Sequence, residues 1–112
     1  MFELRFSEKI NNDIVSTLKY IAEVLEAPRA AENHYEELLE TYEKLKENPF
    51  RRPLVQNRYL ASNGIRSINV KNYVVIYKIN KEQNIVLLYR FLYCRRDWIN
   101  ILTKDLESTT PP

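Results

Sequence analysis

The sequence has few of the residues on which several common kinds of site and scaffold depend. Among 112 residues it has one cysteine (Cys94), one histidine (His34) and one glycine (Gly64). A single cysteine excludes a disulfide framework or a zinc-finger cluster within the chain, and a single glycine excludes a glycine-rich phosphate-binding loop. No grouping of His, Cys and Asp suggests a metal site. We therefore expect neither a metal ion nor another cofactor.

Long apolar runs are also missing. No stretch approaches the length of a membrane span. A secretory signal has a basic region followed by an apolar one, and residues 1–5 do not open such a pattern, so no signal is expected. We expect a cytoplasmic protein that makes no membrane contact. The length of the chain predicts one domain, which we assign to residues 1–106, with residues 107–112 as a flexible tail.

The net charge of +2 conceals a strong division between the two halves of the chain. Residues 1–48 hold 6 Lys and Arg against 11 Asp and Glu, and residues 49–112 hold 11 against 4. The second half is therefore strongly basic. Such asymmetry favours a polyanion or an acidic polypeptide as its partner, although mutual attraction of the two halves within the fold would also account for it.

The first half has the patterns of one strand and two helices. Apolar and polar residues alternate over residues 2–6, which predicts a half-buried strand, and Ser7 then suits a helix N-cap. Apolar residues recur at three- and four-residue spacing over residues 8–26, and again from Pro28 to about residue 47. The junction between these two segments is short, so we expect an antiparallel helical hairpin.

The second half is rich in strand-forming residues. A long polar connection over residues 48–63 precedes three strand-like runs, at residues 65–70, 73–79 and 85–93. The third run is almost continuously apolar, which predicts a central strand. Residues 97–104 have the pattern of a short terminal helix. Helices segregated from strands indicate the α+β class, and the short connections predict an antiparallel meander.

Several segments, taken in order, resemble the RelE/ParE superfamily of toxins from type II toxin–antitoxin systems. They are the helix junction at 25–31 with Pro28 and paired alanines, the helix end at 45–49, the strand segments at 64–66 and 70–77, and the closing segment at 89–98 with Arg95-Arg96-Asp97. The resemblance spans residues 2–103. It implies a RelE/ParE-like fold, in which an N-terminal strand and a helical hairpin pack on an antiparallel sheet that a short C-terminal helix follows.

The resemblance also implies partners and activities. A cognate antitoxin would wrap an acidic or amphipathic segment around the toxin and block its site, and the basic second half is a plausible docking surface. Some members of the superfamily cleave messenger RNA on the ribosome, and others inhibit DNA gyrase without a demonstrated catalytic centre. We expect a metal-independent endoribonuclease that acts on ribosome-bound mRNA. The alternatives are a ParE-like gyrase inhibitor and a degenerate module that only binds an antitoxin.

RNA cleavage without a metal needs a base, an acid and cations around the charged phosphorane, and arginine suits the last role because it binds phosphate bidentately. RelE-like members place Arg, Lys and Tyr on the sheet and the C-terminal segment. By this likeness the candidate catalytic residues are Arg66, Arg90, Arg95 and Tyr93, and the candidate RNA- or anion-binding residues are Lys71, Arg96, Arg51, Arg52 and Arg58.

Structural roles are open for the same side chains. Arg66 could form an ion pair near Asp97, Arg90 could be held by a buried partner because an unpaired charge inside an apolar strand is costly, and Tyr93 could pack in the core. One departure from the family pattern stands out: RNA-cleaving members commonly have an arginine where this chain has Val74, which cannot contact a phosphate electrostatically. His34 lies in the acidic helix, where we expect a packing role rather than that of a general base.

Overall fold

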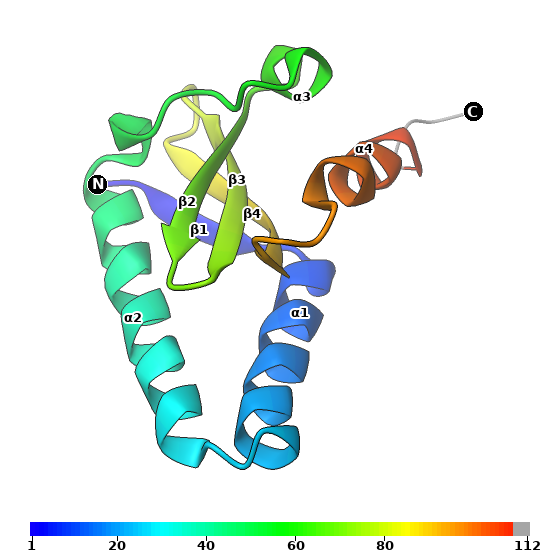
Figure 1. The fold of residues 1–112 in the computed structure, drawn as a ribbon. Coiled ribbons are helices and arrows are strands. Elements are labelled where there is room, and N and C mark those ends of the chain that lie inside the picture. The colour runs from blue at the N-terminus through cyan, green and yellow to red at the C-terminus, as the bar shows by residue number, and fades with distance from the viewer. Residues whose placement is uncertain (109–112) are drawn as a thin grey trace.

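The computed structural model describes residues 1–108 and has the α+β architecture that the sequence predicts (Figure 1). The elements in chain order are β1 (Glu3–Phe6), α1 (Glu8–Lys19), η1 (Tyr20–Val24), α2 (Pro28–Glu47), η2 (Pro49–Arg51), α3 (Arg58–Ser62), β2 (Ile65–Val70), β3 (Tyr73–Asn80), β4 (Ile85–Tyr93) and α4 (Trp98–Ser108). In Figure 1, α1 and α2 form the predicted hairpin, whose tip lies below the sheet; α3 lies above the sheet and α4 to its right.

The four strands form one sheet in the order β1-β4-β3-β2. Strands β2, β3 and β4 make the antiparallel meander expected from their short connections, and β4 is central as its apolar sequence predicts. The first strand joins the edge of β4 in parallel, with Glu3 opposite Ile85 and Phe6 opposite Leu88. The chain therefore closes its sheet by pairing its first strand with its last.

Each face of the sheet has its own apolar core. Alternate residues of β3 supply both: Val75 and Tyr77 pack with α1 and α2 in one cluster, and Val74 and Ile76 pack with α3 and α4 in the other. The period-2 alternation of a strand places neighbouring side chains on opposite faces, which explains this division. The sheet is thus a middle layer between the hairpin and the two shorter helices.

The hairpin begins and turns through specific side-chain and backbone contacts. Ser7 caps α1 as predicted, because its hydroxyl accepts the N–H of Ile10 at 3.0 Å. The expected helix over 8–26 widens at its end into the π-helical turn η1, where Leu25 N–H reaches the carbonyl of Tyr20. Glu26 then takes a positive φ of 52°, which reverses the chain before Pro28 opens α2.

The prediction of a connection without helices over 48–63 is wrong. The segment contains the short 3-10 helix η2 and the one-turn helix α3. Asn48 and Asn57 cap them by accepting backbone N–H groups, from Phe50 at 3.1 Å and Leu60 at 3.0 Å. Helix α3 forms because it buries Leu60 completely in the second core.

The terminal helix is longer than its sequence pattern predicts. It runs from Trp98 to Ser108, so Glu107 and Ser108, expected in the tail, are helical. The apolar face continues past residue 104 because Leu106 packs on the second core with Leu102. The rest of the expected tail, residues 109–112, lies outside the described residues. Within the described chain, no helix has both the length and the apolar character that crossing a membrane requires.

Candidate functional site

Arg90 lies where β4 is irregular. Ile76 is opposite Arg90 but its neighbour Tyr77 is opposite Leu88, so Tyr89 is an extra residue, a β-bulge. From this bulge the Arg90 guanidinium donates two hydrogen bonds to Asp13 of α1, at 2.7 and 2.9 Å, and one to Asp105 of α4, at 2.9 Å. The arginine therefore joins the central strand to one helix on each side of the sheet.

The charges in this cluster are mutually compensated. The side chains of Arg90, Asp13 and Asp105 are 14%, 13% and 20% exposed. The hydrogen bond with Asp13 raises the pKa of Arg90 against the opposing effect of its burial. Burial alone would raise the pKa of Asp105, but hydrogen bonds from Lys9 and Arg90 outweigh it and lower that pKa. Arg90 was predicted either to act at the catalytic site or to be held by a buried partner. In the structure it is held by ion pairs with Asp13 and Asp105.

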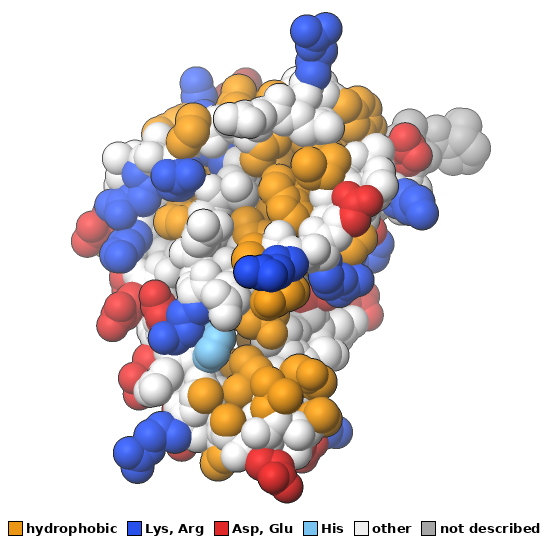
Figure 2. All heavy atoms as spheres, in the orientation of Figure 1, with side chains coloured by type: hydrophobic (Ala, Val, Ile, Leu, Met, Phe, Trp, Pro, Cys, Tyr) orange, Lys and Arg blue, Asp and Glu red, His pale blue; other side chains and the backbone are white. Residues whose placement is uncertain are grey.

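A second group of cations surrounds Phe50 on the segment after α2. We call Arg51, Arg52, Arg66 and Lys81 the loop cluster. The guanidinium of Arg66 lies 5.3 Å from the centroid of the Phe50 ring, and the amine of Lys81 lies 5.4 Å from it. Figure 2 shows Lys and Arg side chains gathered along this edge of the molecule, on the left. The described residues provide no ion-pair partner for these four cations.

The loop cluster also explains the position of Arg66. Its guanidinium donates to the carbonyl of Arg52, and the alternative ion pair near Asp97 is not formed among the described residues. The segment is anchored because the buried hydroxyl of Tyr77 donates to the carbonyl of Pro49 at 2.7 Å. Burial raises the pKa of Tyr77 to about 12, although the neighbouring arginines of the cluster act to lower it. Arg66 thus faces the hairpin side of the sheet, away from α4.

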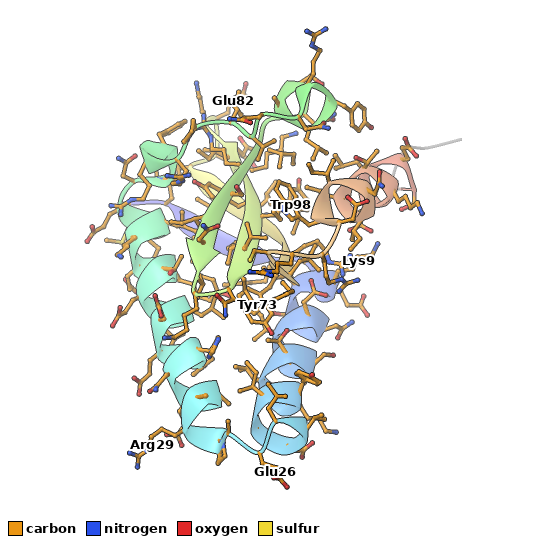
Figure 3. All side chains as sticks on the ribbon, viewed as in Figure 1. Lys9, Glu26, Arg29, Tyr73, Glu82 and Trp98 are labelled. Atoms are coloured by element: carbon orange, nitrogen blue, oxygen red, sulfur yellow. The ribbon has the colours of Figure 1, made fainter. Side chains whose placement is uncertain are left out.

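A third group lies at the opposite end of the sheet, around a hollow of about 610 Å³. We call it the tyrosine hollow; its polar lining is Tyr20, His34, Asn72, Tyr73, Tyr93 and Arg96. Tyr73 lies between α1 and α2 at the end of the sheet (Figure 3), stacked on Phe91 and met edge-on by Tyr93 and His34. Burial, followed by the proximity of Tyr93 and Tyr20, raises the pKa of Tyr73, so this hydroxyl stays protonated.

His34 has the packing role expected of it, but it also faces this hollow. Its Nδ1 lies 2.7 Å from the carbonyl of Ala30, so Nδ1 carries the proton in the neutral ring and Nε2 keeps its lone pair. The proximity of His34 to Tyr93 and Arg96 could not be predicted from the sequence, because it depends on how α2 packs against the ends of β3 and β4. No local sequence pattern signals it.

The predicted catalytic residues do not come together. Lys71 directly follows β2, whereas Arg66 lies near its start. Arg66 lies opposite Tyr77 and Tyr93 lies opposite Tyr73, so these two predicted catalytic residues are about 13 Å apart along β3. Tyr93, Arg95 and Arg96 lie at the Lys71 end, Arg66 lies in the loop cluster, and Arg90 lies between α1 and α4. Lys71 pairs with Glu37 at 3.3 Å, and Arg58 is exposed in α3. Val74 is 2% exposed in the second core, so its side chain is not on a substrate-facing surface.

The described residues hold no group of three His, Cys, Asp or Glu side chains that could bind a metal ion. The predicted catalytic residues thus occupy three places: the loop cluster, the tyrosine hollow with its flanking segment, and the Arg90 charge network between α1 and α4.

Comparison with known proteins places this domain in a family. Residues 4–98 match the model of the ParE toxin of the type II toxin–antitoxin system parDE. No curated protein sequence matches the chain. Because the match covers most of the chain, the protein belongs to the ParE toxin family of type II toxin–antitoxin systems.

Three solved structures share the fold at low sequence identity. A chromosomal ParDE system from P. aeruginosa matches with a TM-score of 0.64 and 15% identity, over 83% of this chain and 96% of that one. The RelBE2 toxin–antitoxin complex of Mycobacterium tuberculosis matches with a TM-score of 0.60 and 21% identity, over 82% and 96%. The RelE–RelB complex of Pyrococcus horikoshii OT3 matches with a TM-score of 0.53 and 13% identity, over 85% and 97%.

Proposed function

We propose that this toxin acts by binding its target rather than by cleaving RNA, and that the target is DNA gyrase. The observation that carries the proposal is the separation of the predicted catalytic residues into three groups. Cleavage at one phosphodiester needs base, acid and cations around the same few atoms, whereas Arg66 and Tyr93 are about 13 Å apart along β3. The pairing of Arg90 with two carboxylates and the burial of Val74 further support a binding mode.

A cognate antitoxin is the second partner in this proposal. The three structural relatives belong to systems or complexes that pair a toxin with an antitoxin. The loop cluster offers four cations without ion-pair partners among the described residues, which suits an acidic antitoxin segment. The same segment would cover Phe50, which is 40% exposed.

The test measures supercoiling by purified gyrase as the purified toxin is added. An inhibitor that works by binding should reach its full effect at a toxin-to-gyrase ratio set by affinity, and the effect should not grow with incubation time. A parallel reaction with translating ribosomes should leave the messenger RNA intact. Undiminished supercoiling, together with transcripts cut within codons, would rule the proposal out.

Ribosome-dependent mRNA cleavage is the second candidate, because one observation favours it. His34, Tyr93 and Arg96 line the same hollow, and the free Nε2 of His34 could accept a proton. On this alternative, His34→Gln and Arg96→Ala should each abolish cleavage on translating ribosomes, while Arg5→Ala, at an exposed position in β1, should leave it unchanged. Cleavage that survives both substitutions would remove the alternative site.

A further inference from the structure

The tyrosine hollow has the size and the lining of a small-ligand site. Its volume is about 610 Å³, and a neighbouring hollow of about 400 Å³ shares Tyr20, Tyr73, Tyr93 and Arg96 with it. Sites for small ligands are concave spaces of roughly 300–1,000 Å³, with mostly apolar walls and a few convergent polar groups. The tyrosine hollow has both kinds of lining, because aliphatic side chains of the hairpin lie beside its polar residues.

Aromatic rings form part of the wall, and two of them are open to solvent. Tyr73 is held by stacking on Phe91, with 4.9 Å between the ring centroids, and Tyr93 meets it edge-on at 5.6 Å. Tyr93 is 38% exposed and Tyr20 is 49% exposed, so both rings keep surface available for a ligand. Nucleobases of any kind stack on such rings, because every base has a π face.

Tyr20 reaches the hollow from the irregular turn η1, which it opens. The Leu25 N–H donates to the carbonyl of Tyr20 at 3.1 Å, the hydrogen bond that widens the helix there. Single π-helical turns of this kind are rare in proteins and are frequent at functional sites. The turn also contributes Ile21 to the wall, so one irregular segment supplies both a ring and an apolar contact.

The polar groups of the hollow are available to a ligand. The hydroxyls of Tyr20, Tyr73 and Tyr93 form no hydrogen bond within residues 1–108, and neither does the side-chain amide of Asn72. The Nε2 of His34 keeps its lone pair, because Nδ1 is the nitrogen that donates to the main chain. The hollow therefore offers donors and acceptors together, which match the hydroxyls of a ribose and the edge of a base.

The charges of the two hollows suit a ligand with one anionic group. Arg96 is the one arginine or lysine among the described residues that line them, and it has no ion-pair partner between residues 1 and 108. Asp13 is the one acid in these linings, and Arg90 compensates its charge. Arginine binds a phosphate bidentately. A nucleic-acid strand, in contrast, needs a row of cations along its backbone.

We propose that the tyrosine hollow binds a free nucleoside monophosphate, with its base stacked on the open tyrosines and its phosphate on Arg96. The proposal does not depend on gyrase as the target, because it concerns binding to the toxin alone. It also differs from the alternative of mRNA cleavage, which places a strand of RNA in the same hollow. The experiment below separates these cases.

The test titrates the full chain with adenosine monophosphate, adenosine, inorganic phosphate and an RNA strand of about ten nucleotides without a terminal phosphate. Amide chemical shifts give both the affinity and the location of binding. Adenosine monophosphate should bind at least ~10-fold more tightly than adenosine, a difference of about 1.4 kcal/mol, and should shift Tyr20, Tyr93 and Arg96. Inorganic phosphate should also bind more weakly than the nucleotide, because it has no ring to stack.

Two substitutions with matched controls assign the two parts of the ligand. In Arg96→Ala, adenosine monophosphate should lose its advantage over adenosine, whereas Arg5→Ala, at an exposed position in β1, should keep it. Tyr20→Ala should weaken both ligands about 5-fold or more, because it removes a stacking surface. Tyr59→Ala should change neither affinity, since Tyr59 is 43% exposed in α3, outside the hollow. An unchanged melting temperature in each variant separates recognition from folding.

Four results would overturn the proposal. They are no chemical-shift change in the hollow with adenosine monophosphate, equal affinity for adenosine or phosphate alone, an undiminished advantage of the nucleotide in Arg96→Ala, and tighter binding of the RNA strand than of the nucleotide. A failure to inhibit gyrase would leave all four measurements unaffected, so the two proposals can fail separately.

Discussion

The two faces of the sheet are covered by helices of very different extent. One face packs against α1 and α2, of 12 and 20 residues, around ten buried core residues. The other packs against α3 and α4, of 5 and 11 residues, around six. The larger core suggests that the hairpin face carries most of the stability, because apolar burial is the dominant favourable contribution to folding. The smaller face depends more on single contacts, and the ion pairs of Asp105 with Arg90 and Lys9 are the clearest of these (Figure 3 labels Lys9).

The largest expected effect comes from the residue that joins both faces. Arg90→Ala should lower the free energy of unfolding by about 3–5 kcal/mol, because it leaves Asp13 and Asp105 partly buried without their cation. Urea unfolding at neutral pH measures it. Arg5→Ala is the control, since Arg5 pairs with Glu3 at an exposed position and should change stability by less than ~1 kcal/mol. Equal effects of the two substitutions would mean that the network does not join the faces.

A leucine-to-alanine cavity should lower the free energy of unfolding by different amounts in the two cores. Leu45 and Leu102 are both fully buried, one on each face. Leu45→Ala should cost about 2–5 kcal/mol. Leu102→Ala should lower the free energy of unfolding by less, because α4 can separate locally while the sheet and hairpin stay folded. Amide hydrogen exchange should then be faster in α4 and unchanged in β3, whereas faster exchange in both would contradict the distinction between the faces.

A smaller, pH-dependent effect is expected at Asp105. The pKa of Asp105 is lowered in the fold from its ordinary value of 3.8, so its ionised form stabilises the protein. This contribution is complete above the unfolded pKa and is lost as the pH falls through the folded one. Asp105→Asn should therefore be less stable than the wild type near neutrality, and the two should converge in acid. A stability difference that stays constant across the acid range would show that ionisation of Asp105 is not the cause.

The smallest effect is expected at the exposed pair of Lys71 and Glu37, whose side chains are 38% and 44% exposed. Glu37→Gln should change the free energy of unfolding by less than ~1 kcal/mol, because water and salt screen such pairs. Glu36→Gln, next to it and without an ion-pair partner among the described residues, is the matched control. A loss of several kcal/mol at Glu37 alone would show that this pair, rather than the apolar core, holds the hairpin to the sheet.

The elements that could be predicted from sequence are those whose signals are local. Period-2 and period-3.6 patterns located the strands and the long helices, and Ser7 marked the start of α1. Helix α3 was missed because a five-residue helix is too short to show a period and forms around one buried residue, Leu60. The parallel pairing of β1 with β4 has no local signal either, since it joins residues about 80 positions apart.

The candidate site was harder to predict for the same reason. That Arg90 would need a partner followed from the cost of burying a charge, but Asp13, 77 positions away, could not be identified as that partner. The basic character of the second half was visible in the sequence, yet its division between the loop cluster and the tyrosine hollow depends on which end of the sheet each cation lies near. His34 joins Tyr93 only through the packing of α2 on the sheet.

The two hydrogen bonds of the Ser7 hydroxyl limit how early the fold can form during translation. This hydroxyl receives Ile10 N–H and donates to the carbonyl of Tyr89 at 2.7 Å, so the beginning of the first helix is tied to the bulge of the last strand. A nascent chain cannot complete this link until Tyr89 has left the ribosome, and contacts so distant in sequence form slowly. Until β4 has emerged, the N-terminal segment has no strand to join, so the complete sheet forms only after the last of its strands has left the ribosome.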